Sequence, residues 1–318
     1  MWRYIIKRLL ILIPVIICVA IVIFTLLYFT PGDPIEAILG PNATNEQRDE
    51  KRAELGLDQP YAVQLGKFLK ELFLEANLGK SYVDGTNVSY QLVQRLPRTI
   101  IIAVMVMLIQ VVIGIPLGMS AATHKDKWQD TFCMFLAMVT TSFPAFWLAL
   151  IMVLFFSLKL GWLPATGVDS WTSYILPCFA AGLHGIGQMG RLTRSQMLEV
   201  KNADYCVTAR AQGVSERTIL YGHALPNALI PIITSIGTHF GTALGGSIVV
   251  EKVFAIPGVG LYMMDAIEAR DYPVIRGGVV ILAIMFCLVM FVVDLCYAFI
   301  DPRIKAQYSQ KKTRRARS

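Results

Sequence analysis

The sequence predicts an all-α, polytopic membrane protein with six transmembrane helices. Of its 318 residues, 55% are hydrophobic and only 16% are charged, and the mean hydropathy of +0.56 is too high for a soluble globular protein of this size. Six windows long enough to cross a hydrocarbon core as a helix are nearly free of charge. Basic residues gather in the segments on one side of these windows, as in multi-pass membrane proteins.

The six windows share a length near that of a membrane-spanning helix. They lie at 9–29, 99–122, 132–157, 174–190, 228–250 and 277–299. The fourth is the least apolar, because four glycines dilute its hydrophobicity and His184 and Gln188 add polar groups. We still expect it to span the membrane. Pro14, Pro116 and Pro144 predict kinks in the first three windows.

The first window has features of a secretory signal, because Arg3, Lys7 and Arg8 precede it. At 21 residues it is longer than the apolar region of a usual signal peptide. No small-x-small cleavage site precedes the sequence FTPGDP at 29–34. We therefore expect an uncleaved membrane anchor.

Lysine and arginine residues determine the expected orientation. If the N-terminus is cytoplasmic, the inner segments hold 17 of the 29 basic residues and the short outer loops only four. The remaining eight lie in a long outer segment, which counts little in this rule. We therefore expect both termini in the cytoplasm. The net charge of +7 then reflects basic loops that face anionic membrane lipids, and it does not indicate a nucleic-acid partner.

Four regions follow from the alternation of apolar windows and polar segments. They are a cytoplasmic N-terminus with the first transmembrane helix (1–30), an extracytoplasmic insertion (31–98), a five-helix core (99–300) with a long loop at 191–227, and a basic cytoplasmic tail (301–318). The insertion is too polar to cross a bilayer and too short for a large core of its own.

Two helices are predicted in the insertion. Thr44 and Gln47 fit a capping box at the start of the first, which ends at Gly56. Asp58 is expected to cap the second, which Pro60 leads. The apolar residues of the second helix fall on one face, which we expect to rest on the spans; they are Tyr61, Leu65, Phe68, Leu69 and Leu72.

The sequence lacks the motifs of a catalytic or cofactor-binding protein. LGKS at 78–81 echoes a nucleotide-binding loop, but Leu74 stands where that loop needs glycine. No zinc-protease motif and no nucleophile elbow appear. His184 and His239 raise the possibility of a metal site, but no cluster of histidine, cysteine or carboxylate accompanies them, so we expect packing roles and no metal. Asp294 is expected to form a structural salt bridge.

The loop at 191–227 is predicted to fold as helix, break and helix. Residues 203–211 are good helix formers, Gly213 provides the break, and Ser215 caps a second helix through Leu220. One interpretation is an amphipathic connector that rests on lipid headgroups. Another is a helix-turn-helix DNA-binding motif in which Arg210 and Arg217 meet phosphates. That motif needs freedom to enter a major groove, whereas both ends of this loop run into membrane spans.

A third interpretation is a docking element, because the loop resembles the cytoplasmic coupling motif of ABC importer permeases. Ala209, Gly213, Leu225 and Pro226 match the spacing of that motif, and His223 replaces its isoleucine. The stretch at 204–231 is similar to DYxxTARAxGxSxxxxxxxHALxNALIP, the pattern of the dipeptide, oligopeptide and nickel branch.

The resemblance covers nearly the whole chain. Matching motifs occur in order as PGDP at 31–34, LGLDQP at 55–60, IGIPLG at 113–118, SFPAFW at 142–147, GWLPATG at 161–167, RDYPV at 270–274 and DPRI at 301–304. PGDP and the long outer segment resemble the first of the two homologous permeases of such importers.

This resemblance implies the type I ABC importer permease fold in a bacterial cytoplasmic (inner) membrane. It implies a second homologous permease, two ATP-binding subunits that hold ATP and Mg²⁺, and an extracytoplasmic solute-binding protein; this chain would bind no cofactor and catalyse no reaction. Peptides are the expected cargo, with nickel or another small solute as the alternative. A channel or secondary transporter would predict internal repeats and charged mid-membrane pairs, which the sequence lacks.

The resemblance also assigns coupling residues in the long loop. Small Ala209 is expected to allow close approach to the ATPase, Pro226 to end the polar stretch, and charged residues to form rim contacts. The residues assigned to coupling are Ala209, Arg210, Gly213, Ser215, Glu216, Arg217, Leu225 and Pro226.

The fifth span carries small and polar residues at helical spacing, for which two roles remain open. They are Ser235, Gly237, Thr238, Gly241, Thr242, Gly245, Gly246 and Ser247. Such residues either allow close helix packing or form the wall of a solute path. Outside, Glu251, Lys252, the sequence IPGVG at 256–260 and Arg270-Asp271 form a turn-rich segment, which is either a gate at the outer mouth or an ordinary solvated loop.

Overall fold

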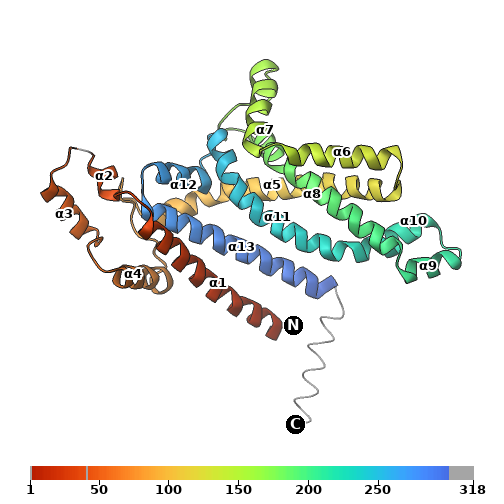
Figure 1. Ribbon diagram of the computed structural model, residues 1–318, viewed down its shortest axis with the longest axis horizontal. Helices are drawn as coiled ribbons and strands as arrows, with labels where there is room; N and C mark the ends of the chain where they lie inside the picture. Colours follow the sequence, from red (N-terminus) through yellow and green to blue (C-terminus); the bar gives the residue numbers. More distant parts are fainter. Residues whose placement is uncertain (1, 41, 301–318) are drawn as a thin grey trace, which may run out of the picture.

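The computed structural model describes residues 2–40 and 42–300. Within these residues the regular structure is helical, apart from one isolated bridge between Lys80 and Asn87. The five longest helices are α1 (Trp2–Phe29), α5 (Val88–Thr123), α8 (Ile175–Lys201), α11 (Leu225–Val253) and α13 (Tyr272–Ile300). They run side by side in one elongated bundle (Figure 1). The all-α prediction is confirmed.

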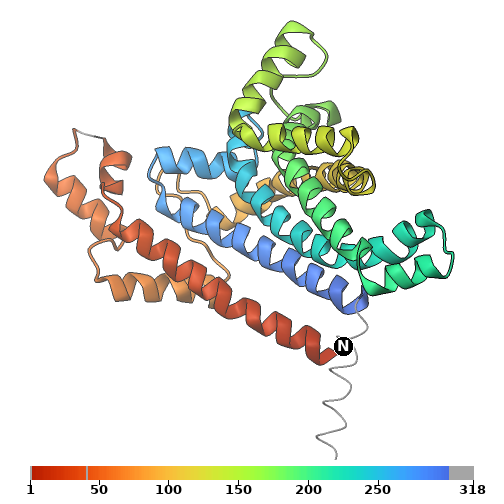
Figure 2. The same cartoon turned by 45° about the vertical axis from the view of Figure 1, so that its right-hand side comes forward.

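Four helices are long and apolar enough to cross a membrane: Arg8–Phe29, Val88–Thr123, Pro231–Val253 and Tyr272–Cys296. A bent helix pair, Trp128–Ser142 with Ala145–Lys159, makes a fifth candidate. The predicted fourth span lies in α8, which is not among these candidates because its glycines and polar groups lower its hydropathy. Most residues of α8 between positions 176 and 190 are nonetheless buried, since this helix occupies the middle of the bundle (Figure 2).

The third predicted span is broken, where the sequence predicted only a kink. Helix α6 (Trp128–Ser142) ends before Phe143, and α7 (Ala145–Met152) continues as the π-helix η1 (Val153–Lys159). The two parts meet at 96°, so the second part runs across the direction of α6 (Figure 2), while Ala149 of α7 is buried in the core cluster of the bundle. Pro144 explains the break, because proline disfavours helical backbone at the residue before it, and Phe143 is extended with φ −104° and ψ 139°.

The core of the bundle forms where α5 and α8 pack along each other. A Cβ atom at Gly114 of α5 would lie 2.8 Å from the Cβ atom of Met189 on α8, so the two helices touch at the backbone. Small residues allow such an approach between transmembrane helices. Ile102 of α5, Leu176 of α8 and Phe240 of α11 belong to one buried core cluster. The glycines of the fourth window therefore serve helix packing.

The insertion contains α2 (Pro34–Leu39), α3 (Asn45–Glu54) and α4 (Tyr61–Leu74). The predicted capping box is confirmed, because the Gln47 amide donates to Thr44 Oγ1 at 3.3 Å and the Thr44 amide donates to Gln47 Oε1 at 3.0 Å. The prediction that Asp58 caps α4 is wrong. Pro60 itself occupies the N-cap position without a side-chain bond, and Gln64 Nε2 instead donates to the carbonyl of Gln59 at 2.8 Å.

The apolar face of α4 rests on α1, as predicted. Phe68 is buried, and its ring stacks on Phe24 with the centroids 5.6 Å apart. The hydroxyls of Tyr61 and Thr25 are 2.8 Å apart. The insertion is therefore attached to the bundle through α1.

The predicted salt bridge of Asp294 is confirmed. Arg8 Nη1 of α1 lies 2.9 Å from Asp294 Oδ2 of α13. The start of α1 and the last turns of α13 lie at the same end of the bundle as α9 and α10, and α2–α4 lie at the opposite end (Figure 1). The predicted basic tail at 301–318, with its DPRI motif, is outside the described residues.

Candidate functional site

The candidate coupling segment (residues 203–226) turns at Gly213, as predicted. Helix α9 (Asp204–Ala211) ends in a Schellman motif, in which the Gly213 amide donates to the carbonyl of Arg210 at 3.0 Å and the Val214 amide to that of Ala209 at 3.1 Å. Gly213 has φ +81°, and a Cβ atom there would meet nothing within 4 Å. The left-handed backbone, rather than lack of space, therefore selects glycine at this position.

The second arm of the candidate coupling segment begins at Ser215, as predicted. Ser215 Oγ accepts a hydrogen bond from the Thr218 amide at 3.3 Å. The predicted separate helix is instead the start of a continuous helical path: α10 (Glu216–Thr218) leads through the π-helix η3 (Ile219–Ala224) into α11. Pro226 sits in the first turn of α11, where proline is tolerated.

Arg210 and Glu216 bond each other across the turn. Arg210 Nε donates to Glu216 Oε1, and Arg210 Nη2 donates to the Lys201 carbonyl at 3.4 Å. The hydrogen bond with Arg210 holds the pKa of Glu216 below its usual value, and it raises the pKa of Arg210. Arg210 and Glu216, which were expected to form rim contacts with a partner, thus bond each other within the segment. Arg217 is exposed.

The inner face of the candidate coupling segment packs on the bundle. Cys206 and Ala209 are buried against Ile219 and Ala224, and half-buried Leu225 packs on the same cluster. The Ala209 side chain therefore faces the chain's own core. Its expected role in the approach to an ATPase stays a prediction, and at 9% exposed the residue itself presents almost no surface.

The outer face carries apolar side chains that were not predicted from the sequence. Tyr205, Val207 and Tyr221 are 44%, 53% and 54% exposed in an otherwise polar segment. Tyr205 and Val207 flank buried Cys206 on α9, and Tyr221 lies in η3. The sequence carries no local signal for this exposure, because it depends on the burial of Cys206 and Ala209 with Ile219 and Ala224 across the turn.

The small residues of α11 fall on two faces. Gly237 and Gly241 face α13, where a Cβ atom at Gly237 would lie 2.9 Å from Val293 and one at Gly241 would collide with the Phe286 ring. Thr238 and Thr242 are exposed on another face. The two glycines therefore allow close packing, and the two threonine hydroxyls donate to backbone carbonyls of α11, to Ser235 and His239 respectively, at 2.9 Å.

The other small and polar residues predicted in the fifth span differ in how deeply they are buried. Ser247 is buried and donates to the Leu244 carbonyl at 2.7 Å. Ser235 is half-buried, and Gly245 has open space around its Cα. Gly246 belongs to α11, but its surroundings lie outside what is described.

The turn-rich segment after α11 is anchored by a buried carboxylate. Glu251 is 0% exposed; it accepts hydrogen bonds from Thr99 Oγ1 of α5 at 2.7 Å and from the Leu261 amide of α12 (Val259–Glu268) at 3.0 Å. Thr99 Oγ1 accepts from the Val259 amide at 2.9 Å. A Cβ atom at Gly258 would collide with the Glu251 carboxylate. This network joins three helices at the insertion end of the bundle.

Two further charged residues, Lys252 and Asp271, fix the same segment. Lys252 Nζ lies 2.7 Å from Asp265 Oδ1 and 3.3 Å from Glu268 Oε1. Asp271 accepts hydrogen bonds from Ser81 Oγ at 2.5 Å and from the Tyr82 amide at 3.0 Å. The segment is therefore not an ordinary solvated loop, because buried and charged contacts attach it to both the bundle and the insertion.

His184 is placed by a local contact. Its Nε2 atom lies 2.9 Å from Gln188 Nε2, one turn along α8. Among the described residues, no group of three or more histidine, cysteine or carboxylate side chains is arranged to hold a metal ion.

Comparisons with known proteins agree with the fold. The computed model resembles an inward-facing MetNI methionine ABC transporter, with a TM-score of 0.58, 19% identity, and coverage of 67% of this chain and 97% of that one. It also resembles an amino acid ABC transporter, with a TM-score of 0.50, 14% identity, and coverage of 65% and 92%.

Curated relatives match almost from end to end. The glutathione transport system permease protein GsiC of Salmonella paratyphi A is 42% identical over 305 residues, which cover 96% of this chain and 99% of the relative. A putative peptide transport system permease protein of Brucella abortus is 43% identical over 313 residues, with the same coverage.

Two family models together span most of the chain. Residues 1–103 match the N-terminal part of a membrane component of binding-protein-dependent transport systems. Residues 114–306 match the model described as binding-protein-dependent transport system inner membrane component. The chain therefore belongs to the family of inner membrane components of binding-protein-dependent transport systems, as a permease with the ABC importer fold.

Proposed function

We propose that this chain forms half of the pathway by which a bacterial ABC importer moves short peptides across the cytoplasmic membrane. The observation that carries the proposal is the 42–43% identity, over 96% of the chain, to permeases named for glutathione and peptide transport. Glutathione is itself a tripeptide, so both names describe cargo with the same backbone chemistry.

The proposed assembly contains four further subunits. A second homologous permease completes the pathway, and two ATP-binding subunits hold ATP and Mg²⁺, so that this chain binds no cofactor. An extracytoplasmic binding protein delivers the peptide. Both termini and the candidate coupling segment lie in the cytoplasm, and the insertion lies outside. The basic inner segments support this orientation.

The candidate coupling segment transmits motion from the ATPases in this proposal. Exposed Tyr205, Val207 and Tyr221 contact the ATPase in this proposal, and Arg217 provides a charged contact. Because the backbone stays helical from Glu216 to Val253, a displacement of the segment moves α11 as a rod. The buried cluster that contains Ile219 keeps α9 and the start of α11 moving together, because packed cores are not continuously deformable.

The far end of α11 meets the outer gate in this proposal. Glu251 links α11 to both α5 and α12, so movement of α11 changes the position of the turn-rich segment. The exposed face of Thr238 and Thr242 lines the pathway. Short hydroxyl side chains suit a cargo whose side chains vary, because they offer hydrogen bonds without a shaped pocket.

Uptake by a deletion strain tests the proposed cargo. Cells that lack this chain, and the same cells with the gene restored, are given labelled glutathione, a labelled neutral dipeptide or ⁶³Ni²⁺. We expect restoration of peptide uptake alone. Restored Ni²⁺ uptake without peptide uptake would replace the peptide proposal with the nickel alternative.

A further inference from the structure

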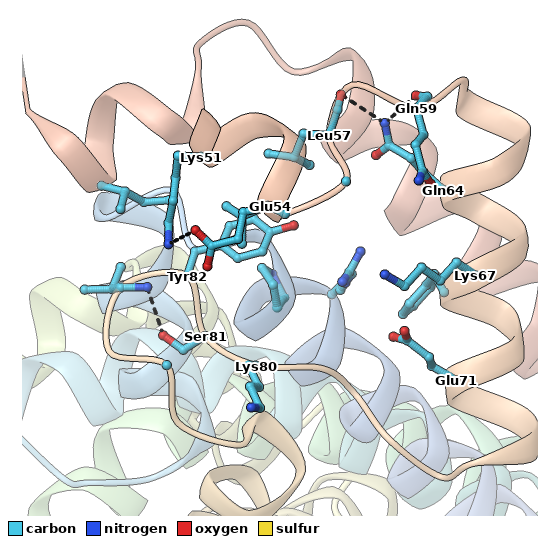
Figure 3. A pocket seen from close by; sticks show the side chains of 18 of the residues that line it. Lys51, Glu54, Leu57, Gln59, Gln64, Lys67, Glu71, Lys80, Ser81 and Tyr82 are labelled. Atoms are coloured by element: carbon cyan, nitrogen blue, oxygen red, sulfur yellow. Dashed lines mark hydrogen bonds and ion pairs between the residues drawn. The ribbon is translucent and has the colours of Figure 1, made fainter. Parts of the chain in front are cut away.

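The insertion and the start of α13 enclose a hollow of about 560 Å³ (Figure 3). Its walls come from α3, α4, the loop at 80–85 and the first turn of α13. A second hollow of about 320 Å³ shares with it the residues Phe24, Leu57, Gln64, Tyr82 and Arg276. The larger volume lies within the range of small-molecule sites in proteins, which is about 300–1,000 Å³.

Charged side chains from four separate segments line the larger hollow. The cations are Lys51 of α3, Lys67 of α4, Lys80 of the loop and Arg276 of α13, and the described acids are Glu54 and Glu71. Lys67 and Glu71 point from α4 into the hollow, with the pair Lys51–Glu54 on the opposite side (Figure 3). Cations therefore exceed carboxylates by two, and both signs of charge are present.

Arg276 has hydrogen-bonding capacity that the described residues do not use. Its guanidinium carbon lies 4.7 Å from the Phe68 ring centroid and 6.0 Å from that of Phe24. Its Nε atom is buried without a hydrogen-bond acceptor among the described residues. The carboxylate of nearby Asp271 is already bonded to Ser81 and the Tyr82 amide. A buried donor left unpaired is unfavourable, so an incoming acceptor would be stabilised here.

We propose that this hollow binds a small zwitterion with more carboxylates than ammonium groups, such as an acidic dipeptide. The guanidinium of Arg276 and the lysines suit carboxylates, and Glu54 and Glu71 offer a place for an ammonium group. Phe24 and Tyr82 supply apolar surface for the ligand's methylene groups. The described lining residues come from the insertion, α1 and α13 rather than from α11, so this site is separate from the proposed pathway and does not depend on the proposed cargo.

Calorimetry on the purified transporter without its binding protein tests the site. The probes are L-alanyl-L-glutamate, L-alanyl-L-alanine and succinate. We expect alanyl-glutamate to bind most tightly, because alanyl-alanine lacks the second carboxylate and succinate lacks the ammonium group. Arg276→Gln is expected to weaken alanyl-glutamate binding at least about tenfold, and Lys67→Gln and Lys80→Gln about 2- to 5-fold each.

Lys70→Gln is the matched control. Lys70 is on α4 three residues from Lys67, its side chain is 68% exposed, and it lies 3.9 Å from Glu75 rather than in the hollow. We expect unchanged binding by this variant. If Arg276→Gln fails to fold, the double variant of exposed Lys67 and Lys80 decides the question.

Three results would overturn the proposal. The first is no heat of binding with alanyl-glutamate up to about 10 mM. The second is equal binding by the Lys67/Lys80 double variant and the Lys70 control. The third is binding that appears only when the binding protein is added, which would make the hollow a docking site for that protein. Because none of these measurements involves uptake, they are independent of the proposed transport function.

Discussion

Thr99 Oγ1 of α5 donates a 2.7 Å hydrogen bond to Glu251 Oε1 of α11, across 152 positions of the chain. Both residues are 0% exposed. The same hydroxyl accepts from the Val259 amide at 2.9 Å. The Thr99 hydroxyl thus forms hydrogen bonds with both a buried carboxylate oxygen and a buried amide. These two bonds attach the turn-rich segment to the bundle.

Thr99→Val is predicted to destabilise the protein. The substitution removes the hydroxyl that donates to Glu251 Oε1 and accepts from the Val259 amide, and a buried polar group that loses its partner costs about 1–3 kcal/mol. Thermal unfolding of the purified transporter measures the loss. Thr99→Ser keeps the hydroxyl and serves as the control. Equal melting temperatures for the valine and serine variants would contradict the role given to this hydrogen bond.

Gly213→Val is predicted to abolish uptake while the protein stays in the membrane. Left-handed backbone costs a residue with a Cβ atom roughly 1–2 kcal/mol, and a β-branched side chain fits it worst. Gly213→Asn should keep most uptake, because asparagine tolerates this conformation and the site has space for a side chain.

Gly222→Ala is the control for the Gly213 variants, because Gly222 lies in η3 and a Cβ atom there makes ordinary contact with Thr218 at 3.8 Å. Uptake and membrane abundance are measured together. Normal uptake by Gly213→Val would remove the turn from the coupling mechanism.

Arg210 and Arg217 are predicted to respond differently to charge reversal. Arg210→Glu places two carboxylates across the turn, so adding Glu216→Arg should restore the ion pair and most ATPase recovery in co-purification. Arg217→Glu alters an exposed contact, and we expect it to weaken recovery in any background. Failure of the Arg210→Glu, Glu216→Arg swap to restore recovery would show that Arg210 contacts the ATPase directly.

Gly241→Leu and Thr242→Leu are predicted to separate packing from transport. Leucine at position 241 collides with the Phe286 ring, and overpacking of this kind costs about 1–3 kcal/mol. Leucine at the exposed position 242 should change stability by less than about 0.5 kcal/mol but reduce uptake. The melting temperature and the uptake rate are compared for both. Unimpaired uptake by a stable Thr242→Leu protein would remove this face from the pathway.

Local signals in the sequence predicted much of the fold. The Thr44–Gln47 capping box, the apolar face of α4 and the Gly213 turn each depend on residues a few positions apart, and the structure confirms all three. The number of apolar helices was harder to predict. Helix α8 contains glycines that pack closely against α5, and these glycines lower its hydropathy although much of the helix is buried. Hydropathy alone does not reveal this burial.

Features that depend on distant residues were missed or mispredicted. Ala209 lies in one buried cluster with Ile219 across the turn, a contact that spacing along α9 does not reveal. The same folding turns Tyr205, Val207 and Tyr221 outward. The link between Thr99 and Glu251 joins two helices far apart in sequence, so no single window contains it.

Cross-linking from the candidate coupling segment tests the central claim most directly. Val207→Cys is introduced after exposed Cys18 and Cys296 are replaced by alanine, and a bifunctional thiol reagent is applied to membranes that contain the whole transporter. The buried thiol of neighbouring Cys206 is an internal control. We predict a cross-link from Val207→Cys to an ATPase subunit and none from Cys206. Labelling of Val207→Cys in intact cells by a membrane-impermeant reagent, together with no ATPase cross-link, would contradict the claim that this segment couples the permease to ATP hydrolysis.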